Sequence, residues 1–161
     1  MTKKNLTASI DIDAAPEQVW GIVSDLKRMP EWSDQCRLMR PLGRVKVGAL
    51  TVNMNHRGRR YWPTVSKIER FEPGHAIAFR TLSNDSVWHF EITPTATGST
   101  VVHRRTVPPH GTKWISYTIV DHWLGGEETF DIEMEEGLNT TLRRIKAALE
   151  HRPAEIWPRT V

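Results

Sequence analysis

The sequence is poor in the residues that cross-link small domains or hold structural metals. Cys36 is the only cysteine among 161 residues, so no disulfide can form within the chain. A structural zinc site needs clustered cysteines and histidines, which a single cysteine does not provide. We therefore expect no bound metal. Disulfide-paired cysteines are typical of proteins in oxidising compartments, so a single cysteine favours a cytoplasmic protein.

Long apolar runs are also missing. No stretch approaches the ~20 consecutive apolar residues that a membrane-spanning helix needs. The first residues, MTKKNLTASIDID, include two lysines but no apolar core, so they lack the pattern of a secretory signal. We therefore expect no integral membrane association.

Motifs of several common enzyme classes are absent as well. The sequence has no GxGxxG or Walker-type phosphate loop and no GxSxG nucleophile turn. Its formal net charge is only +3, with 22 Lys and Arg against 19 Asp and Glu. The compact basic cluster HRGRR at 56–60 has no interleaved aromatics and is interpreted as a solvated hairpin tip. We expect no cofactor and no nucleic-acid partner.

Residues 8–32 combine a strand, a corner and a helix. Ala8, Ile10 and Ile12 alternate with polar residues, which predicts a half-buried strand. Pro16 suits the first turn of a helix, because its fixed φ is helical and its missing N–H would be unpaired there. The spacing of the apolar residues that follow predicts an amphipathic helix, which Pro30 ends.

The middle of the chain reads as an antiparallel meander. Short alternating segments are separated by turn residues such as Gly58 and Pro73-Gly74. The predicted strands are 35–40, 49–56, 61–71, 75–82, 86–93 and 99–107. Residues 114–124 are interpreted as a further strand from their Trp, Ile and Val content, with a helix as the alternative. Pro63, which lacks an N–H, favours an edge position, a bulge or a late strand start in 61–71.

Residues 127–150 predict a long helix with one apolar stripe. The stripe consists of Phe130, Met134, Leu138, Leu142, Ile145 and Leu149. Gly137 is interpreted as a point of close contact between helix and sheet, with room for a ligand as the alternative. We expect one domain over residues 1–152 and an irregular C-terminal tail over 153–161.

This order of elements resembles a known architecture. The segments DAAPEQVWGIVSDLKRMPEWSDQC at 13–36, RRYWPTVSKIERFEPGHAIAFR at 59–80 and EGLNTTLRRIKAALE at 136–150 are similar to the SRPBCC superfamily, and especially to its bacterial polyketide cyclase/dehydrase-like branch. The resemblance implies an α+β helix-grip fold. In that fold a curved antiparallel sheet of about six to seven strands wraps around a long C-terminal helix, with one or more short helices after the first strand.

The resemblance also implies a cavity for a hydrophobic small molecule, which is lipid-like, aromatic or polyketide-like. The expected function is binding of that molecule, with a polyketide cyclase, aromatase or dehydratase as one alternative and a closed interaction module as another. The protein is expected to be a monomer or a homodimer. The residues predicted to contact the ligand are Trp32, Met54, Trp62, Trp88, Phe90, Arg104, Trp123, Phe130, Met134 and Leu138.

Two segments decide which polar groups would reach such a cavity. In 99–107, Arg104 faces inward on one reading, whereas a one-residue slip near 95–98 turns His103 inward instead. In 49–56, the alternation assigns Leu50, Val52 and Met54 to the core face and places His56 at the cavity rim. Arg104, His56 and Tyr61 are accordingly the candidate catalytic residues if the protein is an enzyme.

Overall fold

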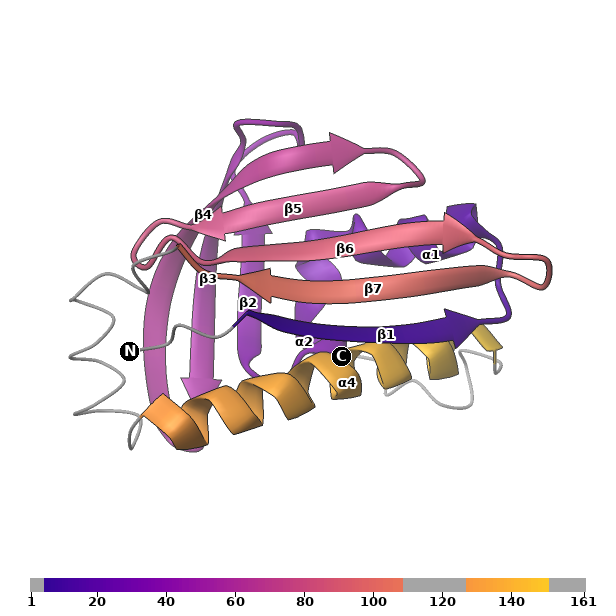
Figure 1. The fold of residues 1–161 in the computed structure, drawn as a ribbon. Helices are drawn as coiled ribbons and strands as arrows, with labels where there is room; N and C mark the ends of the chain where they lie inside the picture. Colours follow the sequence, from indigo (N-terminus) through magenta and orange to yellow (C-terminus); the bar gives the residue numbers. More distant parts are fainter. Residues whose placement is uncertain (1–4, 109–126, 151–161) are drawn as a thin grey trace.

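A computed structural model describes residues 5–108 and 127–150, with side chains in the last helix described from residue 132 onward. Seven antiparallel strands form one sheet in the order β1-β7-β6-β5-β4-β3-β2 (Figure 1). The strands are β1 (Leu6–Ile12), β2 (Cys36–Pro41), β3 (Leu50–Arg57), β4 (Arg60–Glu72), β5 (Ala76–Thr81), β6 (Val87–Pro94) and β7 (Ser99–Thr106). The helices are α1 (Pro16–Val23), η1 (Leu26–Arg28), α2 (Met29–Trp32) and α4 (Glu127–Glu150).

The first strand, β1, forms one edge of the sheet and pairs with the last strand, β7. The C-terminal helix covers the concave side of the sheet. β1 pairs with β7, from Leu6 opposite Arg105 to Ile12 opposite Ser99. The α4 helix runs along β1 under the curved sheet (Figure 1). Leu138, Leu142 and Ile145 of its apolar stripe are fully buried. The predicted helix-grip arrangement is therefore confirmed, including the short helices after β1.

One glycine fixes the corner between β1 and α1. A Cβ at Gly98 would lie 2.2 Å from the backbone oxygen of Ile12 and 2.8 Å from the backbone nitrogen of Ala14. The next residue, Ser99, donates a hydrogen bond from its hydroxyl to the Ala14 carbonyl at 2.8 Å. The β6–β7 turn and the β1–α1 corner are therefore in direct backbone contact.

Replacing Gly98 by alanine should destabilise the protein by about 2 kcal/mol, because backbone atoms on both sides must move to admit one methyl group. Urea unfolding of Gly98→Ala against the wild type measures this. Gly43→Ala is a useful comparison, because open space surrounds Gly43 and its penalty arises from positive φ alone. Equal stability of Gly98→Ala and wild type would contradict the close approach.

The prediction for the faces of β3 was wrong. Thr51 and Asn53 are buried, whereas Leu50 is 38% exposed on the outer face. The reason lies in β4, where Ile68 is fully buried and Ser66 pairs with Thr51. Directly paired residues of antiparallel strands share a face, so the burial of Ile68 turns the polar set of β3 inward.

The inward orientation considered for Arg104 is also corrected. The burial of β7 alternates so that Val101, His103 and Arg105 face the core. Arg104 lies on the outer face, where its guanidinium pairs with Glu91. The alternation of β7 is therefore shifted by one residue from the inward orientation of Arg104, and it turns His103 and Arg105 toward the interior instead.

Two further expectations meet the structure differently. A Cβ at Gly137 would meet nothing within 4 Å, so the close helix–sheet contact predicted there was wrong and the position is open. Pro63 occurs where β4 pairs with β3 alone, because pairing with β5 begins at Ser66. The predicted strand 114–124 and the tail 153–161 lie outside the described residues. Within the described part, no helix is long and apolar enough to cross a membrane.

Candidate ligand-binding cavity

A cavity in two connected compartments lies between the inner face of the sheet and α4. The first has a volume of about 160 Å³ and is bounded mainly by α2, β2, β3, β4 and β5. The second has a volume of about 300 Å³ and lies between α4, the hairpin end of β3 and the segment that follows α2. The compartments share Ser33, Gln35, Trp88, His103 and Met134.

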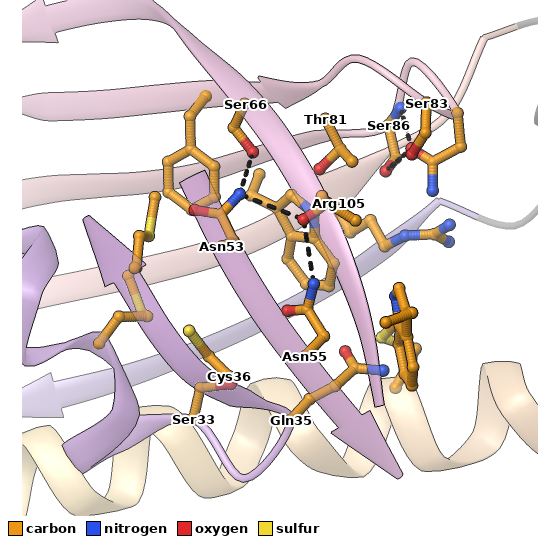
Figure 2. A pocket seen from close by; sticks show the side chains of 18 of the residues that line it. Ser33, Gln35, Cys36, Asn53, Asn55, Ser66, Thr81, Ser83, Ser86 and Arg105 are labelled. Carbon is orange, nitrogen blue, oxygen red and sulfur yellow. Dashed lines mark hydrogen bonds between the residues drawn. The ribbon is translucent and has the colours of Figure 1, made fainter. Parts of the chain in front are cut away.

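One wall of the first compartment is a ladder of amides and hydroxyls. The Asn53 amide donates hydrogen bonds to Ser66 Oγ at 2.9 Å and to Thr64 Oγ1 at 3.2 Å. The Asn55 amide donates to the same Thr64 hydroxyl at 3.0 Å (Figure 2). Thr51, next to this wall, donates to Asn53 Oδ1 at 2.9 Å. The hydrogen bonds within the ladder offset the cost of placing these polar groups in the interior.

A buried guanidinium and an indole form another part of the wall. Arg105 is 1% exposed and pairs with Trp88 across β6 and β7. Its guanidinium carbon lies 5.8 Å from the Trp88 ring centroid, which is a cation–π distance. A guanidinium is always charged and presents a fixed fork of donors, so it suits carbonyl or carboxylate oxygens. Both residues line the first compartment.

His103 is held in one protonation state at the junction of the compartments. Its ring stacks on Phe90 with centroids 3.9 Å apart, and its Nδ1 lies 2.9 Å from the His89 carbonyl. A carbonyl oxygen only accepts, so Nδ1 carries the proton and Nε2 keeps its lone pair. Burial lowers the pKa of His103 to about 4, so the ring is neutral at physiological pH and offers an acceptor to a ligand hydroxyl.

Cys36 also lines the first compartment, where its thiol is kept protonated by burial. Burial raises the pKa of its thiol to about 11, so the thiolate is scarce at neutral pH.

The hairpin tip of β3 and β4 is tied to α4 beside the second compartment. Arg57 and Glu133 form a two-point ion pair, with Nε to Oε2 at 2.5 Å and Nη2 to Oε1 at 2.6 Å. His56 lies on the same rim, where its Nε2 contacts the Asp34 carbonyl and its ring stacks on Tyr61 at 5.6 Å. The ion pair joins two walls of the compartment.

The structure brings only some of the predicted ligand residues together. Trp62, Trp88 and Met134 line the first compartment, and Leu138 and His56 line the second. Trp32 and Phe90 are fully buried behind the lining, while Met54, Tyr61 and Arg104 belong to the outer face. Trp123 and the side chain of Phe130 lie outside the described residues. The candidate set Arg104, His56 and Tyr61 therefore does not converge on the cavity.

The residues that the sequence analysis missed are the polar ones. Asn53, Asn55 and Thr64 alternate with apolar neighbours, and an apolar face was taken as the core face. The available signal was the matching series TxNxN in 51–55 and TxS in 64–66, which pairs amides with hydroxyls across neighbouring strands. The orientation in which His103 faces inward would also have placed Arg105 in the interior, because residues two apart in a strand share a face.

The curved sheet, the long closing helix and the cavity between them define a helix-grip protein with an internal site. The family model described as "Polyketide cyclase / dehydrase and lipid transport" matches residues 3–150. The chain belongs to this family, as the resemblance in the sequence indicated. No curated protein matches the chain.

Solved structures share the fold at low sequence identity. The di-domain ARO/CYC StfQ from the steffimycin biosynthetic pathway has a TM-score of 0.69 at 16% identity, over 93% of this chain and 51% of StfQ. This chain thus spans about half of StfQ. TTHA0849 from Thermus thermophilus has a TM-score of 0.69 at 14% identity, over 91% of this chain and 97% of that one. DR_A0006 from Deinococcus radiodurans has a TM-score of 0.65 at 17% identity, over 91% and 97% of the two chains.

Proposed function

We propose that this protein binds a largely apolar small molecule that carries carbonyl or hydroxyl oxygens, of the aromatic or polyketide type. The observation that carries the proposal is the buried Arg105 guanidinium in the same compartment as the amide ladder and two tryptophans. A purely aliphatic lipid would leave these polar groups without new partners as it displaced water. An oxygen-bearing ring system satisfies the polar wall and stacks on Trp62 and Trp88.

A second candidate function is cyclisation or dehydration of such a molecule. The family description and the ARO/CYC designation of StfQ favour it. In this chain, the cavity would fold a flexible poly-β-keto chain, and Arg105 would stabilise negative charge on an enolate oxygen. The neutral His103 Nε2 would accept a proton. With its pKa near 4, His103 is a weak base, so binding has the stronger support.

The binding proposal is tested by titrating the protein with hydroxylated naphthalenes and anthraquinones while recording tryptophan fluorescence. Trp62 and Trp88 lie in the cavity wall, so a bound aromatic ring should quench their emission saturably. Two aliphatic ligands serve for comparison: decanoate, which has one polar end, and decane, which has no polar group. Saturable quenching by the oxygenated aromatics, with weaker binding of decane, supports the proposal. Equal binding of decane would contradict the role of the polar wall.

A cavity-filling variant locates the site. Gly137→Leu places a side chain in open space that lines the second compartment, so it should weaken binding at least tenfold while the helix gains a better helix former than glycine. Asn139→Leu, at an exposed position of the same helix, is the matched control. Unchanged affinity in Gly137→Leu would place the ligand outside the second compartment.

A further inference from the structure

The charge of this chain is divided unevenly along its length. Residues 35–68 contain eight Lys and Arg and no Asp or Glu, so all 19 acidic residues lie elsewhere and the rest of the chain is net negative. This segment forms β2, β3 and most of β4, at one end of the sheet. Its exposed cations are Arg37, Arg40, Arg44, Lys46, Arg59, Arg60 and Lys67.

The same three strands carry an apolar outer face. Its members, here called the outer apolar face, are Leu38, Leu50, Val52, Met54, Tyr61 and Val65. Leu38 is 42% exposed and Leu50 and Val65 are each 38% exposed, although all three lie in paired strands. Pairing places cations within the face as well as around it, with Arg40 opposite Val52 and Lys67 opposite Leu50.

We propose that the outer apolar face docks onto an anionic phospholipid surface. Apolar side chains can enter the interface while Lys and Arg remain at the headgroups, each adding about 1 kcal/mol near an anionic membrane. The charge of an anionic bilayer is spread over its whole surface. It therefore complements a face that carries only basic charged residues, without specific ion pairs to orient the protein. The sheet curves around α4, so this face is convex and suits a broad surface better than a small ligand (Figure 1).

The charge pattern distinguishes this occupant from two others. A second copy docked face to face by a two-fold axis would bring like charges together, which is unfavourable. A folded protein partner forms interfaces whose cores are depleted of charge, whereas Arg40 and Lys67 lie among the apolar side chains of this face. The outer apolar face lies on the side of the sheet opposite the proposed ligand cavity, so the two can act independently.

Vesicle co-sedimentation tests the proposal, with vesicles of phosphatidylcholine alone and of phosphatidylcholine with phosphatidylglycerol. The wild type should bind the anionic vesicles in low salt and the neutral ones weakly. Arg40→Gln/Lys67→Gln should lower the partition coefficient roughly thirtyfold, from two cations removed at the surface. The matched control, Lys27→Gln/Arg143→Gln, removes two exposed cations away from this face and should bind like the wild type.

The apolar contribution is tested at high salt, where electrostatic attraction is screened. Leu50→Ser should then bind roughly fivefold more weakly than the wild type, because an apolar side chain no longer enters the interface. Ile132→Ser removes an exposed apolar side chain from α4 and is the control. Thermal melts of each variant confirm folding, since all six substituted positions are solvent-exposed in the structure.

Three outcomes would overturn the proposal. In the first, the wild type does not sediment with anionic vesicles in low salt. In the second, the two double variants weaken binding equally, which would show that binding depends on the net charge of the protein and not on this face. In the third, the protein binds soluble polyglutamate or forms a dimer in sedimentation equilibrium, and Leu50→Ser abolishes that association while vesicle binding is unaffected. The third result would assign the face to an acidic polypeptide or to a second copy.

Discussion

Replacing Arg105 by glutamine is expected to weaken binding of an oxygenated aromatic ligand by about 10- to 100-fold, because a hydrogen bond to a charged group is worth about 1.5–3 kcal/mol. Arg105 is 1% exposed and lines the first compartment, so its donors act in a region of low dielectric. Tryptophan quenching by a hydroxyanthraquinone measures the loss. The affinity for a ring without oxygens should change much less, since that ring has nothing to accept from the guanidinium.

The neighbouring residue provides a matched control. Arg104→Gln removes the same group one position away, but Arg104 pairs with Glu91 on the outer face. Its affinity for the ligand should equal that of the wild type. Arg105→Lys keeps the charge and loses the planar fork, so its affinity should be intermediate. Equal losses in Arg104→Gln and Arg105→Gln would contradict the assignment of faces in β7.

Acid should destabilise the protein through His103. Burial lowers the pKa of this residue from 6.5 to about 4, so protonation is easier in the unfolded chain than in the fold. The stabilising contribution is complete above pH 6.5 and is lost as the pH falls toward 4. The difference between the two pKa values corresponds to roughly 3 kcal/mol of unfolding free energy at the acid end.

The contribution of His103 is isolated by comparing pH profiles of urea unfolding for the wild type and His103→Gln. Glutamine can donate to the His89 carbonyl without titrating, so the variant should lose stability less steeply between pH 6.5 and 4. His75→Gln, at an exposed position, serves as the control and should follow the wild type. Parallel profiles of wild type and His103→Gln would show that the ring does not titrate with unfolding.

The two faces of the sheet differ in composition. Arg105 and His103 share the inward face of β7 and lie beside Trp88 and Phe90 of β6. The same sheet has an outer surface with a different composition, where Leu50 and Val65 are exposed among cations. The strand alternation therefore gives this protein a polar inner wall and an apolar outer face at one end of the sheet.

The sequence was sufficient for the architecture because the signals for the elements are local. The Pro16 helix start, the Gly58 and Pro73-Gly74 turns and the stripe through Leu138, Leu142 and Ile145 each act over a few residues. Their order specifies a first strand that returns to the end of the meander and a helix that covers it. The family follows from the same order of segments.

Only the tertiary structure decided which side of each strand meets the cavity. Leu50, Val52 and Met54 look like a core face in isolation, but pairing with a β4 strand whose Ile68 is fully buried turns them outward. Likewise, one residue of register exchanged Arg104 for Arg105. The physical reason is that side chains alternate with a period of two, so a local pattern fixes which residues share a face, while long-range pairing fixes where that face points.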